Sequence, residues 1–346
     1  MKRSCTIHYL IGSYGDWVSA CVSSFPDAPS ERAGGNFPAE GRGLGKRTIL
    51  IFVDGIGWGE ADSDANPCSR YPGELFRLPA LPSKKGVVDL ALNGLARPID
   101  ALLGVDGVPQ SATGQATLLS GVNAQGKLGK HLTGFPNPVL REILREHSLL
   151  KILTDRGRRA CFLNAFRPLF WEISSEQQWR LSATTVANLA AGLPFFTLDD
   201  VAAGQSVYQE FTNEDLRQRG FDVPLRTPQE AGRILARQAR EYDFTLFEYF
   251  QTDKAGHSGE VGRCAEELAR LDVFVGAALR ELERDLGQDT LVVLTSDHGN
   301  LEDCSTRRHT VNPVPLMAWG DGARALVAAV GRLDEVTPAI LARHPA

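Results

Sequence analysis

The sequence predicts an α/β fold in which a mostly parallel central sheet carries helices on both faces. Strand-length apolar runs, such as residues 48–53, 244–250 and 291–294, alternate along the chain with amphipathic segments of helix length. Within these runs apolar residues occupy consecutive positions, as expected for strands that are buried on both faces of a sheet. The pattern is that of a doubly covered sheet with one large core.

The elements are expected in a regular order. Residues 48–53 form a strand, which a glycine-rich loop over residues 55–59 follows, and residues 60–85 read as an irregular excursion. Further strands are expected at 96–103, 159–165, 244–250 and from 291. Helices are expected at 111–121, 138–153, 227–242, 263–286 and 333–343.

The helix boundaries carry specific end signals. Gly121 is expected to end the short helix that starts near Ser111, and Gly157 to stop the helix over 138–153. Thr227, followed by Pro228 and by a glutamate three residues on, is typical of a helix N-terminus.

The chain divides into an extension and a core. Residues 1–45 are predicted to be a disordered N-terminal extension, because residues 26–45 are rich in Gly, Pro, Ser, Glu and Arg. Residues 46–346 are predicted to form the core. Within it, residues 167–226 show weak periodicity and many polar side chains, and they are interpreted as a small inserted cap.

The composition limits the possible partners. The chain has 346 residues, of which 43% are hydrophobic, and a formal net charge of −5. Because no basic stripe is present, we expect no nucleic-acid partner. No apolar run approaches the length of a membrane span, so we also expect no membrane partner.

The cysteines indicate a reducing compartment. Six are scattered along the chain without a CxxC pair, as expected for free thiols of a cytoplasmic protein. The segment 18–21 resembles a lipoprotein cleavage box, which would indicate export instead. The segment before it contains His8, Gly12 and Asp16, which a signal sequence disfavours. We therefore expect a cytoplasmic protein.

Carboxylates and imidazoles follow the predicted strands at the point where each strand ends. Asp54 follows the first strand, Asp253 and His257 follow the strand at 244–250, and Asp297 and His298 follow the strand that starts at 291. His309 precedes another apolar run. Ligands bind at the carboxyl ends of such strands.

Each of these motifs has an ordinary explanation when taken alone, since a DxxxH segment can be a solvated loop and a lone histidine is more often structural. Their joint occurrence is informative, because three carboxylates packed together repel one another unless divalent cations offset their charge. Mixed carboxylate and imidazole ligands suit Zn²⁺ or Mn²⁺ rather than Ca²⁺. The sequence therefore predicts a site for two divalent metal ions.

Ser111 is the candidate nucleophile. It lies at the start of a predicted short helix, where backbone N–H groups favour an oxyanion or a phosphate, and Gly114 would let a substrate approach the backbone. Metal coordination is one way to activate a serine hydroxyl. The ordinary alternative is that Ser111 only caps the helix.

With these residues in hand, the chain resembles the alkaline phosphatase superfamily of metalloenzymes, from about Arg47 to the C-terminus except for the insertion. It is most similar to the branch of cofactor-independent phosphoglycerate mutase and phosphopentomutase. The resemblance rests on the segments 296–300 (SDHGN) and 309–316 (HTVNPVPL), with 53–57 (VDGIG), 252–257 (TDKAGH) and 111–114 (SATG) in matching order.

The resemblance implies a division of roles. Asp253, His257 and His309 would hold one metal ion. The other would be held by four further residues: Asp54, Asp297, His298 and Ser111. Two ions about 4 Å apart would clamp a phosphoryl group and stabilise the developing charge. Ser111, with Thr113 as the second candidate, would form a phosphoserine intermediate. Transfer of the phosphoryl group to water makes a phosphatase, and transfer to another hydroxyl of the substrate makes a mutase.

Departures from the family pattern bear on the activity. About sixty residues are available for a cap, whereas the two mutases carry a substantial cap domain, which argues against mutase activity. Lys130 and His131 follow the nucleophile helix and are candidate substrate contacts. The C/S-x-P-x-R context of sulfatases is absent around Ser111, so sulfatase activity is disfavoured.

We therefore predict a metal-dependent phosphatase or phosphomutase that acts on a small phosphate ester. A phosphodiesterase or phosphonate hydrolase of the same superfamily is one alternative, and it would hydrolyse diesters above monoesters. A non-catalytic metal-binding relative is another, although all six ligands and the serine are present. A zinc protease is disfavoured because the chain has no HExxH helix.

Overall fold

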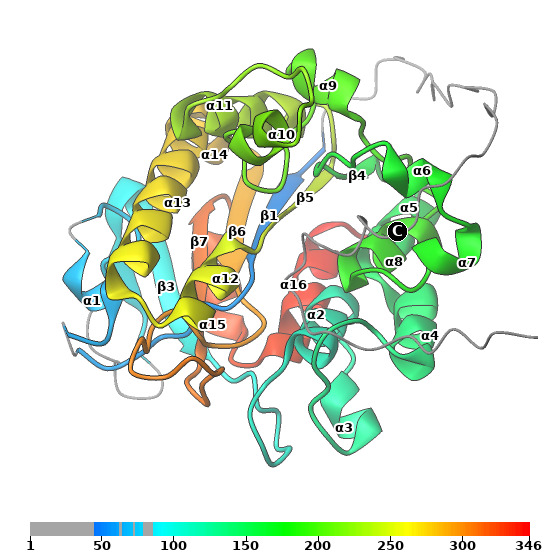
Figure 1. Ribbon diagram of the computed structural model, residues 1–346. Helices are drawn as coiled ribbons and strands as arrows, with labels where there is room; N and C mark the ends of the chain where they lie inside the picture. The colour runs from blue at the N-terminus through cyan, green and yellow to red at the C-terminus, as the bar shows by residue number, and fades with distance from the viewer. Residues whose placement is uncertain (1–44, 62–63, 72, 79–85) are drawn as a thin grey trace, which may run out of the picture. The chain divides into compact units, whose positions relative to one another are not determined.

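The computed structural model describes residues 45–346 except 62–63, 72 and 79–85 (Figure 1). The predicted extension at 1–45 lies outside the described residues apart from Gly45, and so does part of the expected excursion at 60–85. Among the described residues, no helix combines the length and the apolar composition that crossing a bilayer requires.

A seven-stranded sheet in the order β2-β3-β7-β6-β1-β5-β4 forms the centre of the structure. Its strands are β1 (Arg47–Val53), β2 (Val88–Leu90), β3 (Gly94–Ile99), β4 (Ala160–Phe162), β5 (Phe244–Tyr249), β6 (Thr290–Thr295) and β7 (Val314–Gly320). Every residue of β1, β5 and β6 is buried, which explains their continuous apolar runs.

The prediction of a mostly parallel sheet is only partly right. Strands β6, β1, β5 and β4 are parallel neighbours, whereas β7 pairs antiparallel with both β6 and β3, and β2 pairs antiparallel with β3. The antiparallel side arises because β7 follows β6 through a long loop rather than through a crossover helix. The parallel half is the part that carries the candidate site.

Helices cover both faces of the sheet, as predicted, and the burial pattern of β1 shows how (Figure 1). Ile49 and Ile51 belong to a core that includes residues of α11 (Pro228–Ala239) and α13 (Val261–Glu281). Leu50 and Phe52 face the opposite core. That second core lies beneath α2 (Ser111–Ser120), α4 (Pro138–His147), α5 (Leu149–Asp155), α8 (Ala183–Ala190), α15 (Ala323–Ala329) and α16 (Val336–Arg343).

The end signals of two helices are confirmed. Helix α2 ends at Ser120, and Gly121 adopts the left-handed conformation with φ 72°. Helix α11 begins with Pro228, and its N-cap Thr227 forms a reciprocal capping box with Glu230.

Other helix boundaries differ from the prediction. The helix expected over 138–153 is broken at Ser148, whose extended backbone ends α4 and whose hydroxyl accepts a hydrogen bond from Lys151 N to start α5. The serine thus acts as an N-cap inside a continuous apolar pattern. The helix expected over 263–286 begins earlier, as α13, and continues as the separate α14 (Glu283–Leu286). The terminal helix divides into η2 (Leu333–Glu335) and α16.

The segment 167–226 consists of short helices: α6 (Leu169–Glu172), α7 (Ser175–Gln178), α8, α9 (Leu198–Ala202) and α10 (Glu214–Gln218). Helix α8 packs against α2, α4 and α5 and contributes Ala183, Val186 and Ala187 to the main core. A small separate cluster contains Val201, Tyr208 and Leu216 from the later part. The interpretation of the whole segment as a cap stays a prediction.

The remaining elements are short. They are α1 (Pro67–Arg70), η1 (Ala91–Asn93), α3 (Ala124–Leu128) and α12 (Gln251–Ser258). Helix α12 follows β5 directly and is the one that bears on the site.

Candidate metal centre

The predicted ligands converge at one edge of the sheet. Strands β6, β1 and β5 are parallel neighbours, so their carboxyl ends lie side by side. Asp54 directly follows β1, Asp297 lies two residues beyond β6, and Asp253 lies in the first turn of α12. The topology therefore brings three carboxylates together from positions far apart in the sequence.

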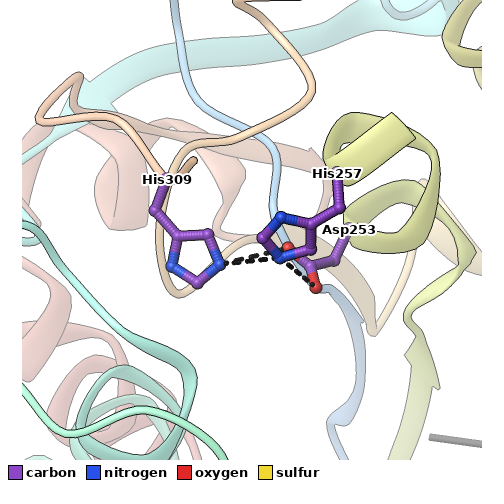
Figure 2. A group of neighbouring side chains, drawn as sticks. All are labelled: Asp253, His257 and His309. Atoms are coloured by element: carbon purple, nitrogen blue, oxygen red, sulfur yellow. Dashed lines mark hydrogen bonds and ion pairs between the residues drawn. The ribbon is translucent and has the colours of Figure 1, made fainter. Parts of the chain in front are cut away.

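One group of ligand atoms consists of Asp253, His257 and His309 (Figure 2). Helix α12 places Asp253 and His257 one turn apart, with His257 Nε2 at 3.4 Å from Asp253 Oδ2. His309 arrives from the loop before β7, and its Nε2 lies 3.4 Å from Asp253 Oδ1 and 3.2 Å from His257 Nε2. Two imidazole nitrogens and a carboxylate thus point toward one position.

The remaining ligands form an adjoining group around His298. His298 Nε2 lies 3.1 Å from Asp54 Oδ1, 3.5 Å from Asp297 Oδ2 and 3.0 Å from Ser111 Oγ. The His298 ring stacks on the His309 ring, with centroids 3.7 Å apart. Ligand atoms of Asp54, Asp253 and His298 also lie close enough to share an ion, so Asp253 belongs to both groups.

The orientation of the two outer histidines suits metal binding. His257 Nδ1 lies 2.9 Å from Arg307 O, and His309 Nδ1 lies 3.1 Å from Pro109 O. A carbonyl oxygen can only accept, so each Nδ1 donates, and in the neutral ring each Nε2 then keeps a lone pair toward the site. Such a bond to the outer nitrogen is the usual support of a metal-binding histidine.

The carboxylate groups are also suited to bind a cation. Asp54 Oδ1 and Asp297 Oδ2 are buried, and among the described residues neither makes a hydrogen bond of good geometry, although His298 Nε2 lies 3.1 and 3.5 Å from them. Buried carboxylate oxygens are normally paired or bound to metal, because leaving them unpaired is costly. The donors are carboxylate and imidazole, a set that divalent transition metals accept.

Burial and mutual repulsion dominate the electrostatics of the carboxylates. Burial, together with the nearby carboxylates of Asp297 and Asp253, raises the pKa of Asp54 from 3.8 to about 7. Burial likewise raises the pKa of Asp297 to about 6, although the His298 charge opposes the shift. Without bound cations, the protein therefore disfavours the state in which all these carboxyl groups are ionised. This is expected of a site where cations normally balance the negative charge.

The pKa values of His298 and His257 also rise, but here the neighbouring carboxylates favour the charged form of the ring. Although burial opposes a charged ring, the carboxylates of Asp297 and Asp54 raise the pKa of His298 to about 10. A hydrogen bond to Asp253 raises the pKa of His257 above its usual value. Although burial opposes it, hydrogen bonds from His257 and His309 hold the pKa of Asp253 well below its usual range. Without metal, a proton on His298 therefore offsets part of the negative charge.

Ser111 is the first helical residue of α2 rather than its N-cap, which is Gln110. Its side chain is buried, and its hydroxyl faces His298. The second candidate, Thr113, is fully buried, donates its hydroxyl hydrogen to Gln110 O and accepts from Leu132 N. The Thr113 hydroxyl is thus engaged with backbone groups, whereas the Ser111 hydroxyl faces His298. Which of the two is the nucleophile stays a prediction.

Gly114 has a packing role in this structure. A Cβ atom at this position would lie 2.7 Å from Asp297 O and 2.9 Å from Asp297 Cβ. The absence of a side chain therefore allows α2 to approach the segment that carries Asp297 and His298. A contact of Gly114 with substrate stays a prediction.

Lys130 and His131 follow helix α3. Lys130 is exposed, and His131 Nε2 lies 3.1 Å from Val105 O. Within the described chain, neither residue belongs to the two ligand groups. Their proposed role as substrate contacts stays a prediction.

Three supporting residues were not predicted from the sequence. Gln115 Nε2 donates to Asp54 Oδ2 at 3.0 Å, and Asn300 Nδ2 donates to Asp253 Oδ1 at 2.7 Å. Glu302 is buried and accepts four hydrogen bonds from loops near the ligands. Asn300 and Glu302 lie within four residues of His298. The sequence cue for Glu302 was a glutamate inside an otherwise buried segment.

Comparisons with known proteins agree with the predicted resemblance. Residues 221–345 match the family described as "Metalloenzyme superfamily". The chain is 31% identical over 107 residues to the 2,3-bisphosphoglycerate-independent phosphoglycerate mutase of Desulforudis audaxviator, a match that covers 29% of this chain and 20% of the relative. It is 31% identical over 150 residues to the mutase of the same name from Pyrococcus abyssi, covering 43% and 32%.

These matches span only about a fifth to a third of the length of the curated relatives. Among solved structures, the PH0037 protein from Pyrococcus horikoshii superposes with a TM-score of 0.50 at 15% identity, over 87% of this chain and 97% of the other. That likeness supports the fold. The resemblance that the motifs predicted is confirmed.

Proposed function

We propose that the chain, of which residues 221–345 match the metalloenzyme superfamily and a stretch of 107 residues resembles a 2,3-bisphosphoglycerate-independent phosphoglycerate mutase, transfers the phosphoryl group of a small phosphate ester. The observation that carries the proposal is the position of the Ser111 hydroxyl. It lies 3.0 Å from His298 Nε2, beside two ligand groups that share Asp253.

We assign the ligands of two divalent ions to these groups. Asp253, His257 and His309 would hold one ion. The other would be held by Asp54, Asp297, His298 and the Ser111 oxygen. Such ions, when bound, polarise the phosphoryl oxygens and lower the pKa of the serine hydroxyl. The donor set suits Mn²⁺ and Zn²⁺.

The serine supplies the covalent step. Ser111 Oγ attacks phosphorus, an Oγ–P bond forms, and the bond from phosphorus to the ester oxygen breaks, so that the alcohol leaves. Water, or a second hydroxyl of the substrate, then attacks the phosphoserine and frees Ser111. With water the result is a phosphatase, and with a substrate hydroxyl it is a mutase. Ser111 is the first residue of α2, and the partial positive charge of a helix N-terminus favours the negative charge of a transferred phosphoryl group.

The proposal also covers the cellular compartment of the protein and the kind of molecule on which it acts. The four described cysteines, Cys68, Cys161, Cys264 and Cys304, are free and buried, which supports the expected cytoplasmic location. A small phosphate ester is the partner that we propose for a serine hydroxyl lying beside two candidate metal-binding groups.

The experiment is hydrolysis by the Mn²⁺-loaded protein of a panel of phosphomonoesters and phosphodiesters. Ser111→Ala is compared with Ser120→Ala, which removes a buried hydroxyl from the other end of the same helix. We expect monoester turnover that Ser111→Ala abolishes and Ser120→Ala retains. Turnover restricted to diesters would indicate a diesterase instead. A protein that holds metal without turning over any ester or rearranging any sugar phosphate would contradict the proposal.

A further inference from the structure

Glu302 is a buried carboxylate that does not belong to either ligand group. Its side chain is 2% exposed. Oε2 accepts hydrogen bonds from Gly57 N and Asn300 N, both at 2.8 Å. Oε1 accepts from Thr310 Oγ1 and, at 3.0 Å, from Asn312 Nδ2. All four partners are uncharged donors, and among the described residues they give each oxygen of the carboxyl group two hydrogen bonds.

The donors lie on the segments that carry the proposed metal ligands. Gly57 lies three residues after Asp54, and Asn300 lies two residues after His298. Thr310 directly follows His309. One carboxylate therefore connects the loop after β1 with both ends of the long loop between β6 and β7, and these segments contribute ligands to both groups.

Asn300 extends the connection to α12. Its backbone N–H donates to Glu302, while its side-chain Nδ2 donates to Asp253 Oδ1 at 2.7 Å and to Asp253 O at 3.1 Å. Asp253 is the residue that both ligand groups share. Asn300 thus links Glu302 to Asp253 by hydrogen bonds.

The loops are built to approach this carboxylate closely. A Cβ atom at Gly57 or at Gly299 would overlap the Glu302 carboxyl group. Glycine at both positions permits the contact, since any larger residue would push the loops away from it. Two glycines thus adapt the loops to the carboxylate.

We propose that Glu302 is a positioning residue that sets the geometry of both metal-binding groups at once. Outer hydrogen-bond partners of metal ligands typically contribute 10- to 100-fold in metal affinity. Because Glu302 holds segments that supply ligands to both groups, its loss should weaken both ions together. Loss of a single ligand should weaken one ion first.

A buried carboxylate can also serve stability alone, and Asp272 supplies a matched control. Asp272 lies on α13, is 7% exposed, and accepts hydrogen bonds from Glu74 N, Leu75 N and Phe76 N. None of these donors lies in a segment that carries a proposed ligand. Asp272→Asn should therefore lower stability without changing metal affinity.

The experiment is a calorimetric titration of the metal-free full chain with Mn²⁺, together with thermal unfolding of each metal-free variant. Glu302→Gln keeps the shape of the side chain but replaces an acceptor oxygen with an NH₂ group that faces donors. We expect both Mn²⁺ dissociation constants to rise about tenfold or more in Glu302→Gln. Asp272→Asn should stay within about twofold of the wild type.

A milder pair of variants tests the same contact while retaining the carboxylate. Thr310→Val removes one of the four donors with little change in shape, and Thr310→Ser retains the hydroxyl. We expect Thr310→Val to weaken both ions by a smaller factor and Thr310→Ser to bind nearly as the wild type does. This pair decides the question if Glu302→Gln does not fold.

The inference rests on the two-ion part of the proposed function, and the results separate the two. Wild-type affinity at both positions in Glu302→Gln or in Thr310→Val, or weakening of one ion only, would overturn the positioning role and leave the proposed function intact. A wild-type protein that binds no Mn²⁺ would overturn both.

Discussion

Ser111 Oγ and His298 Nε2 lie 3.0 Å apart, although 187 positions separate them in the sequence. The contact joins the first turn of α2 to the loop that follows β6. It places a hydroxyl at the point where the carboxylates of Asp54 and Asp297 approach the same imidazole.

Replacement of Ser111 should separate chemistry from metal binding. Ser111→Ala removes the proposed nucleophile but only one weak ligand, so we expect at least about a thousandfold loss in kcat/KM with two Mn²⁺ still bound. Activity measured beside calorimetry checks this. Thr113→Val is the matched comparison. It removes a hydroxyl that bonds only to backbone groups, and we expect it to retain activity at a cost of about 1 kcal/mol in stability. The reverse outcome would make Thr113 the nucleophile.

Removal of His257 should empty one metal position. His257 belongs to the group with Asp253 and His309 and has no contact with Ser111 or Asp297 in the described chain. In His257→Ala, metal analysis after gel filtration should therefore find one Mn²⁺ per chain instead of two. His147→Ala, a change at a half-exposed position on α4, should leave the stoichiometry unchanged. Two tightly bound ions in His257→Ala would contradict the assigned ligand groups.

A methyl group at Gly114 should disturb the site through packing. The new Cβ would lie 2.7 Å from Asp297 O, so Gly114→Ala forces α2 away from the Asp297 segment. We expect a loss of about 1–3 kcal/mol in the free energy of unfolding and reduced activity. Gly262→Ala in α13 meets nothing within 4 Å and should be neutral or stabilising by up to about 1 kcal/mol. Equal stability of the two variants, measured by urea unfolding, would show that α2 accommodates the methyl group.

Glu248 should make the stability depend on pH. It lies in β5, and its Oε2 accepts a hydrogen bond from Thr184 Oγ1 at 2.6 Å. Burial, opposed by this bond and assisted by the Asp54 carboxylate, raises the pKa of Glu248 from 4.5 to about 8. Between these two values the folded state keeps a proton that the unfolded state has lost, so Glu248 reduces stability progressively as pH rises through this window.

Glu248→Gln removes that titration. We therefore expect the stability of this variant relative to the wild type to increase steadily from about pH 5 to about pH 8 and then to level off. Urea unfolding of the metal-free proteins at several pH values measures the difference. A difference that does not change with pH would contradict a protonated Glu248 in the folded state.

Much of the fold could be predicted because its signals are local. The buried strands β1, β5 and β6 appear as apolar runs, and the Thr227 capping box fixes the start of α11. The break at Ser148 was missed because the apolar pattern continues across it. The antiparallel side of the sheet was missed because strand direction depends on how β7 returns beside β6, which the residues of β7 do not encode locally.

In the site, too, residues with a local sequence signal could be predicted, and residues defined by distant contacts could not. Asp54, Asp253 and Asp297 could be found because each stands at the end of a buried strand, where a charged residue has no packing role. Gln115 and Glu302 could not be assigned, because their partners lie 61 and 245 positions away. Gly114 was interpreted as room for a substrate, and only the structure shows the Asp297 backbone against it.

The most direct test of the central claim is mass spectrometry of the peptide that contains Ser111, after acid quenching of the Mn²⁺-loaded enzyme during turnover of a phosphomonoester. The account predicts that this peptide gains the mass of one phosphoryl group at Ser111, and that the gain disappears in Ser111→Ala. Turnover without phosphorylation of Ser111, or phosphorylation at another residue, would contradict it.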